Sequence, residues 1–529
     1  MADDRSGPAQ ASRDVWHLGA LVVAVALACT TLAIIVPGQL RLPVVPQDEG
    51  TLLVYPVQML RGAVPNRAFV SVYGTVNLWV LALAFKVLGV SVTTERLVGL
   101  AYRIVIVVGL VTLVWRRHGA PAAVVAGGTA VLFFAGLLGL VAYAWLAALA
   151  FASVALALLA VPTGGRAGTK RDVVVGACFG LAVGCRLDLG LAVVLVFAAL
   201  LLTQAWRLPR VLAGVGAGLL PVVVNVARAG PAAVLRHEVL QPIFVSEPAR
   251  RIALSTLSWE QLAIVSLCVA VAVAGTVVAL VRLRRQRSDA SVGVQLSVFA
   301  FDLGLLPELF QRVDFVHVGL VACFVLPTSL LLAPTATWQR RAPSLGAIAR
   351  NAIVPLFLAA AAYVLAGPLY GDFFRAEASA FPHTRPPFSV TNQGRTLPVG
   401  SPADAAALSG LALSLDHLAR PGQRLFVGPS DLRTAYYNDT DLYFLFPHLV
   451  PGTTYLEMDP GVSNARRSAL ARQLEGDAFL VLSPRYDMPS SPASAAPLGP
   501  AAPNHVVTTD FHRVGTWGSW TLWAHDAAT

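Results

Sequence analysis

Two adjacent carboxylates, Asp48 and Glu49, occur in the segment Gln47-Asp48-Glu49-Gly50, shortly after the first long apolar run of the chain. Carboxylates beside an apolar surface are unfavourable unless they are solvated, paired or bound to a metal. A carboxylate here can take the proton of an attacking hydroxyl, or hold a divalent cation that offsets the charge of a phosphate. The alternative is a solvated turn in which Asp48 caps the following helix.

A second charged segment, Cys185-Arg186-Leu187-Asp188, interrupts an apolar stretch. Charged side chains at such a depth in a membrane are functional or are paired with each other. The sequence leaves both interpretations open. Arg186 binds an anionic ligand, or Arg186 and Asp188 form a pair that reaches the aqueous interface.

A third segment, Gln311 to His317, contains Arg312, Asp314 and His317 between two apolar runs. The planar guanidinium of Arg312 suits phosphate oxygens, and the imidazole of His317 can donate a hydrogen bond or a proton to the same group. The alternative is a histidine that only supports the structure. The combination of an arginine, an aspartate and a histidine in one turn favours an anion site.

One further loop is charged, and its members are His237, Glu238, Glu247, Arg250 and Arg251. We assign Arg250 and Arg251 to substrate access, against the simpler interpretation of a solvated loop. The sequence contains no GxGxxG motif followed by an acidic residue, no P-loop and no nucleophile elbow. Nucleotide-driven and hydrolase functions therefore have no support.

The composition places these residues in a membrane protein. Hydrophobic residues make up 56% of the 529 positions and charged residues 13%, too few charges for a soluble chain of this length. From Pro368 onward there are 11 Lys and Arg against 14 Asp and Glu, so the net charge of +10 arises in the apolar part of the chain. This distribution is typical of basic cytoplasmic loops and excludes a nucleic-acid partner.

Apolar runs of about 20 residues predict transmembrane helices. With the N-terminus in the cytoplasm, 16 basic residues of the short connections fall on the cytoplasmic face, which is the pattern that inner-membrane proteins follow. We therefore predict a multi-pass protein of the plasma (inner) membrane. The eleven predicted spans are Trp16 to Val36, Leu97 to Trp115, Ala120 to Val141, Tyr143 to Val161, Val173 to Cys185, Leu189 to Thr203, Val211 to Ala227, Trp259 to Val281, Ser291 to Leu306, Val316 to Ala333 and Asn351 to Gly367.

This topology divides the chain into a transmembrane domain, residues 1–368, and an extracytoplasmic domain, residues 369–529. The first outer loop, 37–96, includes the apolar stretch Tyr73 to Val90, which we expect to lie along the membrane surface. Pro307 to Phe315 is predicted as a short outer turn. In the extracytoplasmic domain we predict helices over Pro402 to Ala419 and Ser463 to Leu474, strands over Arg424 to Gly428 and Ala478 to Ser483, and a hairpin of His505 to Thr509 with Thr516 to Ala524.

The spacing of Asp48, Gly62, Pro65, Tyr73-Gly74, Gly89 and Arg96 resembles the first extracytoplasmic loop of the GT-C superfamily of glycosyltransferases. These enzymes use polyprenyl-phosphate sugars and include protein O-mannosyltransferases, aminoarabinose transferases and actinobacterial arabinofuranosyltransferases. The resemblance implies a mostly α polytopic fold with a C-terminal extracytoplasmic α/β domain. It implies that Asp48 is the base or a metal-linked acid, with Glu49 as its partner and Tyr73 in contact with substrate.

By the same resemblance, Arg186, Arg312 and His317 bind the donor phosphate, with Asp188 and Asp314 beside the substrate. The implied partners are a polyprenyl-phosphate sugar donor, a glycan or glycolipid acceptor and the membrane lipid itself. Relatives place a second acidic residue between the third and fourth spans, whereas Gly136 to Trp145 contains none. Whether a divalent metal (Mg²⁺, Mn²⁺ or Ca²⁺) binds at Asp48 or Glu49 is therefore left open.

The residues thus predict an inverting sugar transfer at the outer face of the membrane. The Ala-, Val-, Arg- and Gly-rich composition is typical of a high-GC actinobacterium and favours arabinofuranose or mannose as the sugar. The alternative function is a transporter or flippase of a lipid-linked sugar, which needs the cationic residues but no base at Asp48. Such a protein favours internal repeats and charges near the bilayer midplane, and the sequence contains no convincing repeat.

Overall fold

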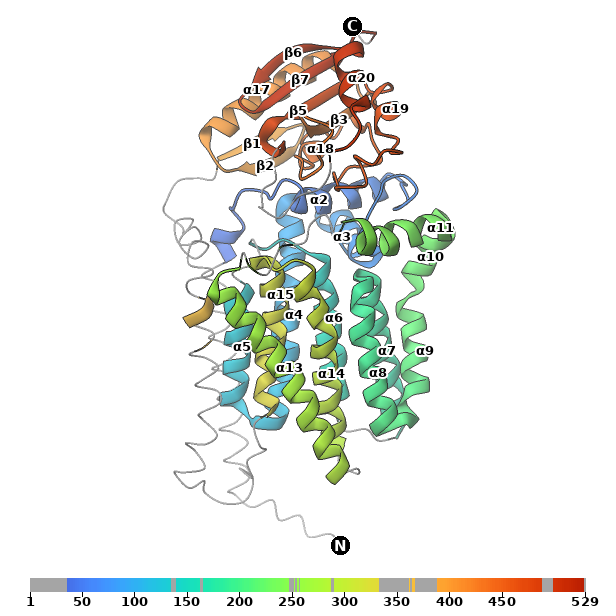
Figure 1. Ribbon diagram of the computed structural model, residues 1–529, viewed down its shortest axis with the longest axis vertical. Coiled ribbons are helices and arrows are strands. Elements are labelled where there is room, and N and C mark those ends of the chain that lie inside the picture. The colour runs from blue at the N-terminus through green and yellow to red at the C-terminus, as the bar shows by residue number, and fades with distance from the viewer. Residues whose placement is uncertain are drawn as a thin grey trace.

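The structure, a computed structural model, consists of a bundle of long helices covered at one end by short helices and then by a domain that contains a β-sheet (Figure 1). The sheet domain and the bundle therefore form separate layers, with the short helices between them. The structure describes residues 36–134, 139–161, 165–246, 252, 255, 257–286, 290–332, 361, 364–366, 388–487 and 498–527.

Among the described residues, five helical stretches are long and apolar enough to cross a membrane, as expected of a multi-pass membrane protein. They are Val92–His118, Leu187–Gly218, Trp259–Arg285, Ser291–Phe310 and Phe315–Leu332. The bundle helices are α4 (Val92–His118), α5 (Ala120–Phe134), α6 (Ala144–Leu159), α7 (Gly165–Cys185), α8 (Gly190–Gln204), α9 (Leu208–Gly218), α10 (Leu220–Ala229), α13 (Trp259–Arg285), α14 (Ala290–Gln311) and α15 (Phe315–Thr328).

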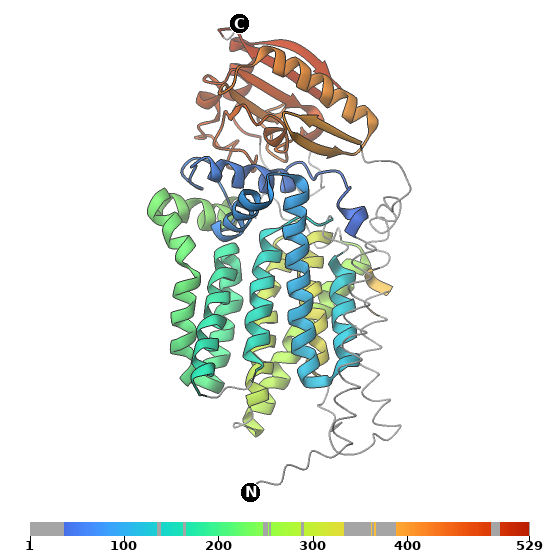
Figure 2. The ribbon, with the colours of Figure 1, turned by 180° about the vertical axis from the view of Figure 1, so that it is seen from behind.

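The predicted spans from Leu97 to Ala333 fall on these helices, and Val211 to Ala227 falls on α9 and α10 together. The backbone leaves the helical conformation at Gln204, so α8 and α9 stand as neighbouring columns rather than one rod (Figures 1 and 2). The predicted span Trp16 to Val36, and all of Asn351 to Gly367 except residues 361 and 364–366, lie outside the described residues.

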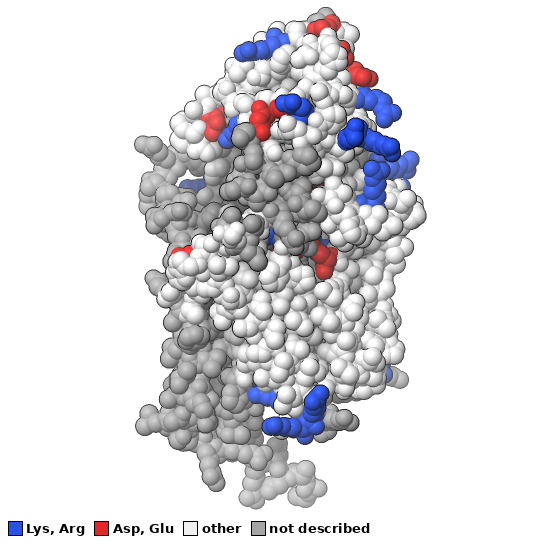
Figure 3. All heavy atoms as spheres, in the orientation of Figure 1, with Lys and Arg blue, Asp and Glu red and all other residues white. Residues whose placement is uncertain are grey.

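Local signals in the sequence set several helix ends. The Ser91 hydroxyl accepts a hydrogen bond from the Thr94 amide at the start of α4, and Ser258 forms a capping box with Gln261 at the start of α13. Arginines fill the last turns of α4 and α13, where they complement the helix dipole. Both of these last turns lie at the end of the bundle opposite the sheet domain, where Figure 3 shows basic side chains.

Glycines bring α7 and α9 into close contact. A Cβ atom at Gly176 would lie 1.9 Å from the carbonyl oxygen of Val211, and one at Gly214 would lie 2.0 Å from that of Val173. Small residues at such contacts are characteristic of helix packing in membranes, where close van der Waals contact replaces hydrophobic burial. The packed pair fixes the position of Cys185, at the end of α7, and hence of the charged segment that follows.

The layer that covers the bundle comes from residues 48–88 and from residues 231–246. It comprises α2 (Asp48–Leu60), α3 (Thr75–Leu88), α11 (Pro231–Val234) and two short π-helical segments, η3 (Leu235–Leu240) and η4 (Pro242–Ser246). Figures 1 and 2 show α2 lying across the end of the bundle, beneath the sheet domain. The start of α2 therefore lies between the two layers.

The C-terminal domain has a five-stranded sheet in the order β4-β3-β5-β7-β6. Strands β3 (Arg424–Pro429), β4 (Val450–Pro451) and β5 (Phe479–Ser483) are parallel, and β6 (Phe511–Trp517) and β7 (Trp520–His525) form an antiparallel hairpin on the far side of β5. The helices are α17 (Pro402–Leu418), α18 (Leu442–Leu445), α19 (Leu470–Leu474) and α20 (Ala502–Asp510). This mixed α/β arrangement agrees with the predicted fold class.

Three local predictions were wrong, and one hairpin was not predicted. Residues 505–509 are helical in α20, because Pro503 favours a helix start, and the first arm of the hairpin is β6 instead. Only 470–474 of the predicted helix over 463–474 is helical, since turns occupy the rest. The proline-rich stretch before 402 contains an unpredicted hairpin of β1 (Phe388–Asn392) and β2 (Arg395–Val399), with Gln393 and Gly394 at positive φ in its turn.

The third wrong prediction concerns the turn Pro307 to Phe315. Helix α14 continues through Pro307 to Gln311, so the proline lies inside a helix. Glu308 is consequently part of the last turns of α14 and is buried, with 2% of its side chain exposed. This displacement of one helical turn changes the composition of the site.

Candidate active site

The start of α2 is held by the C-terminal domain. The Asp48 amide donates to the Tyr437 hydroxyl (3.4 Å), the Asn438 amide donates to the Gln47 side-chain oxygen (2.9 Å), and the Asp441 amide donates to the Pro46 carbonyl (3.0 Å). Gln47 occupies the N-cap position, so Asp48 lies in the first turn and is not the cap. The C-terminal domain therefore contributes directly to the surroundings of Asp48.

Gly50 makes this contact sterically feasible. A Cβ atom at Gly50 would lie 2.5 Å from the Asp441 backbone nitrogen, closer than side chains tolerate. The two chain segments approach each other backbone to backbone, which only glycine permits here. Gly50 is thus required for the contact between α2 and the C-terminal domain.

Glu49 has a different role from Asp48. Its two carboxylate oxygens accept hydrogen bonds from Arg96, at 2.6 Å from Nε and 3.0 Å from Nη2, and Oε2 also accepts from the Val45 amide. Both side chains are buried, with 0% of Glu49 and 2% of Arg96 exposed. Arg96 also donates to four backbone carbonyls of the preceding loop, those of Gln39, Leu40, Leu42 and Pro43. This pair joins α2, α4 and residues 39–43.

The donor atoms around Asp48 do not fit a resident metal ion. Metals such as Mg²⁺ and Ca²⁺ need several oxygen ligands, but the Glu49 oxygens are engaged by Arg96. Across the described part of the chain, no three His, Cys, Asp or Glu side chains converge in a metal-binding arrangement. No step of the mechanism below is therefore assigned to a metal.

The cationic residues meet in one network around Glu308. Arg186 Nη2 lies 3.9 Å from Glu308 Oε1, and His317 Nε2 lies 3.5 Å from the same oxygen. Asp314 connects the other end, because its Oδ1 is 2.7 Å from His317 Nδ1 and its Oδ2 is 2.9 Å from Arg312 Nε. The structure thus brings Arg186, Arg312 and His317 together, from three different helix ends.

Arg186 is the most embedded cation of this network that still reaches solvent, with 17% of its side chain exposed. It pairs with Asp188 through two hydrogen bonds. Its guanidinium also lies over two aromatic rings, 5.7 Å from the ring centroid of Tyr73 and 4.9 Å from that of Trp145. Cation–π contacts of this kind orient the guanidinium without occupying its donors.

Tyr73 and Tyr143 connect Asp48 with the network. Tyr143 is half-buried and lies within electrostatic range of Asp48, Glu49 and Tyr73, while the Tyr73 ring contacts Arg186. The Tyr143 hydroxyl, the Trp145 indole nitrogen and both Glu308 oxygens are buried without a hydrogen-bond partner among the described residues. Buried polar groups of this kind are costly unless a ligand or water satisfies them, so they mark a site.

The acidic groups of the site differ in the direction in which their surroundings shift the pKa. Burial acts to raise the pKa of Asp314, but His317 and Arg312 outweigh it and hold the pKa below its usual range. Burial and the neighbouring Asp439 raise the pKa of Asp441, whose backbone contacts the start of α2. Burial and the nearby Asp48 carboxylate likewise raise the pKa of Tyr437, so its hydroxyl stays protonated beside Asp48.

The site contains residues that the sequence interpretation missed, namely Tyr143, Trp145, Glu308, Tyr437 and Asp441. Glu308 had a usable signal, since it is an acidic residue inside an apolar stretch. Tyr437 and Asp441 had none, because they are almost 400 positions away from Asp48 in sequence. Of the predicted residues, Arg250 and Arg251 lie outside the described part of the chain.

The fold and this site together define a polytopic membrane protein with a charged site between its helix bundle and its C-terminal domain. No family model and no curated protein matches the sequence. Solved structures do match. ArnT from Cupriavidus metallidurans in the apo state has a TM-score of 0.51 and 16% identity, covering 96% of this chain and 98% of that one.

The archaeal oligosaccharyltransferase AglB from Archaeoglobus fulgidus, in complex with an inhibitory peptide and a dolichol-phosphate, has a TM-score of 0.53 and 11% identity. The match covers 97% of this chain and 74% of AglB. The apo form of the same oligosaccharyltransferase gives a TM-score of 0.52 at 12% identity. ArnT and AglB are members of the GT-C superfamily, and the chain has the GT-C fold that the resemblance predicted.

Proposed function

We propose that this protein is a glycosyltransferase that moves a sugar from a polyprenyl-phosphate donor to an acceptor hydroxyl. The observation that carries the proposal is the convergence of Arg186, His317 and Arg312 around Glu308, at the bundle end where Asp48 meets the outer domain. The polyprenyl chain would remain in lipid beside the bundle, and its phosphate would lie at the network.

The proposed reaction is a single inverting displacement. Asp48 takes the proton of the acceptor hydroxyl while the hydroxyl oxygen forms a bond to the anomeric carbon of the sugar. The bond between that carbon and the phosphate oxygen breaks, and the electron pair leaves with the lipid phosphate. Asp48 ends the reaction protonated, and the phosphate carries the additional negative charge.

The cations lower the barrier because negative charge grows on the leaving phosphate in the transition state. Arg186 offers a planar guanidinium held by Tyr73 and Trp145. Arg312 follows the end of α14, and His317 lies at the start of α15. Each cation has a carboxylate partner before the donor binds, so Asp188, Glu308 and Asp314 preorganise the cations. Glu49 is assigned a positioning role, because Arg96 engages both of its oxygens.

The substrates follow from the same placement. The acceptor would bind between Asp48 and the C-terminal domain, where Tyr437 lies, and we propose a glycan or glycolipid of the cell envelope. Arabinofuranose or mannose is the proposed sugar. The proposed orientation places the N-terminus in the cytoplasm and the C-terminal domain outside, since the arginine-rich helix ends lie at the opposite end of the bundle.

The test is a transfer assay with radiolabelled polyprenyl-phosphate sugar and purified protein. Asp48→Asn is expected to reduce the transfer rate about 10²- to 10⁴-fold, the range for loss of a general base, while donor binding is retained. Arg312→Ala is expected to weaken donor binding. Asp431→Asn, on the C-terminal domain and in a half-exposed pair with Arg433, serves as the matched control and should transfer at the wild-type rate.

Unchanged transfer in Asp48→Asn would remove Asp48 from the mechanism. A transporter of lipid-linked sugars would give a third pattern. Both variants and the wild type would then show no transfer, and flipping of the donor would depend on Arg312 alone.

A further inference from the structure

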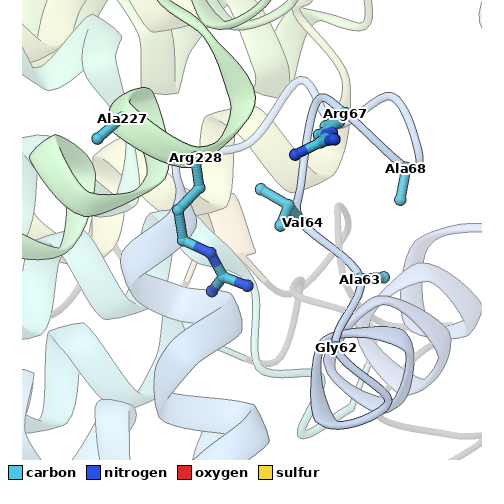
Figure 4. Close-up of a pocket in the computed structure, with 7 residues that line it drawn as sticks. All are labelled: Gly62, Ala63, Val64, Arg67, Ala68, Ala227 and Arg228. Atoms are coloured by element: carbon cyan, nitrogen blue, oxygen red, sulfur yellow. The ribbon is translucent and has the colours of Figure 1, made fainter.

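A cavity of about 540 Å³ lies between the first outer loop and the outer end of α10. Two arginines from separate elements line it, Arg67 from the loop and Arg228 from the last turn of α10 (Figure 4). Figure 4 shows both guanidinium groups turned into the space between the loop and the helix. The remaining lining residues are small or apolar: Gly62, Ala63, Val64, Ala68 and Ala227.

The charge of this cavity is not compensated from within the described part of the chain. Arg67 and Arg228 are exposed, and neither guanidinium makes an ion pair or hydrogen bond with another described residue. One carboxyl group, that of Glu238, contacts the loop that carries Arg67, since it accepts a hydrogen bond from the Asn66 side chain at 2.7 Å. Burial raises the pKa of Glu238 to about 8, so at pH 7 it stays largely neutral and supplies no counter-charge.

A helix end accounts for only one of the two arginines. A basic residue in the last turn is favoured by the helix dipole, which explains Arg228 on α10. Arg67 belongs to no helix or strand, and it faces the same space although two like charges repel each other. An anion held between the two guanidinium groups removes this repulsion.

The loop that carries Arg67 is held in a fixed conformation. Asn66 has a positive φ of 65°, and its side chain donates to Glu238 in η3 and accepts from the Ser71 amide. At the far end of the loop, Val70 donates to the Thr454 carbonyl and accepts from the Tyr55 hydroxyl. Arg67 is therefore presented on a preorganised segment, which reduces the entropic cost of binding.

The surroundings of the cavity point to lipid. Apolar side chains are exposed on α10 and on the neighbouring η3 and η4, namely Leu220, Val223, Val224, Leu235, Leu240, Ile243 and Phe244. Figure 1 shows α10 rising along the side of the bundle and leading into α11, beside α2 and α3. Exposed apolar residues at this level are typical of segments that lie in the membrane interface.

From these observations we infer that the Arg67–Arg228 cavity binds the phosphate of a second membrane lipid, separate from the donor phosphate at Arg186. The phosphate would accept charge-assisted hydrogen bonds from both guanidinium groups. The acyl chains would lie along the exposed apolar side of α10. The inference does not depend on sugar transfer, because it concerns residues outside the proposed catalytic machinery.

The test measures equilibrium binding of a fluorescent short-chain phosphatidylglycerol to the full-length protein in neutral detergent. The double variant Arg67→Ala/Arg228→Ala is expected to bind about tenfold more weakly or worse, as loss of charge-assisted hydrogen bonds predicts. The double variant Arg67→Lys/Arg228→Lys keeps both charges and should lose less. Arg466→Ala/Arg467→Ala removes two exposed arginines of the C-terminal domain and should bind as the wild type does.

Thermal unfolding of each variant shows that it is folded, which is expected because neither arginine has a partner in the described structure. Wild-type affinity in the Arg67→Ala/Arg228→Ala variant would overturn the inference. Equal loss in the Arg466→Ala/Arg467→Ala variant would also overturn it, because binding would then follow net charge alone. Inorganic phosphate is the competitor, and displacement of the lipid at comparable concentrations would assign the cavity to a soluble anion instead.

Discussion

Two arginine–carboxylate contacts lie at the same end of the bundle in opposite surroundings. Arg96 is 2% exposed, and its guanidinium is saturated by Glu49 and four backbone carbonyls. Arg186 is 17% exposed, its carboxylate partner Asp188 is 29% exposed, and aromatic rings rather than carbonyls cover its faces. The first guanidinium has no capacity left for a ligand, whereas the second can exchange partners.

This difference in burial distinguishes a structural ion pair from one that can bind a ligand, a distinction that the sequence does not make. The closed pair, Arg96 with Glu49, holds α2 and α4 in place and fixes the position of the adjacent Asp48. The open pair, Arg186 with Asp188, is held in position but remains accessible, as a site for a phosphate requires. An arginine and an acidic residue thus have different roles in the two pairs, because burial decides how many of their hydrogen-bonding atoms are already engaged.

The largest expected effect comes from opening the closed pair. Glu49→Gln leaves the buried Arg96 without its counter-charge, so we expect a loss of about 3–5 kcal/mol in the free energy of unfolding. Thermal or denaturant unfolding in detergent measures it. Asp48→Asn is the matched control, because Asp48 is the adjacent residue and is only half buried, and it should stay within about 0.5 kcal/mol of the wild type. Equal stability of the two variants would contradict the comparison.

The second test acts on the open pair. Arg186→Lys keeps the charge but removes the planar fork that faces Asp188 and the aromatic rings. We expect donor binding or transfer to fall by about 10- to 100-fold, with an unfolding free energy near that of the wild type. Arg433→Lys, which changes a half-exposed pair with Asp431, provides the control. A loss of stability comparable with that of Glu49→Gln would show that Arg186 is structural as well.

The smallest expected effect is a pH dependence of the stability, which arises from Asp314 in the network around Glu308. The folded-state pKa of Asp314 lies below its unfolded value, so its contribution to stability is present above about pH 4 and is lost as the pH falls through the folded-state pKa. As the pH falls below about 4, the wild type should therefore lose more stability than Asp314→Asn does. Parallel unfolding profiles for the two proteins would exclude this role of Asp314.

The sequence alone determined the apolar helices and the cationic segments, and it singled out Asp48 as a candidate residue. Length and hydropathy suffice for a helix in lipid, because every backbone group must be satisfied within the segment. Strands β3 and β5 and helix α17 were likewise predictable, since their apolar patterns and caps are local. The GT-C resemblance extended these local signals to an overall fold, which the solved structures confirm.

Only the tertiary structure decided which charges meet. Glu308 enters the site because α14 continues through Pro307, and packing rather than local propensity holds that turn helical. Tyr437 and Asp441 reach Asp48 because the C-terminal domain docks on Gly50, a contact without a local signal. Glu49 and Asp48 are adjacent in sequence, and their different surroundings follow from the position of Arg96, which long-range packing sets.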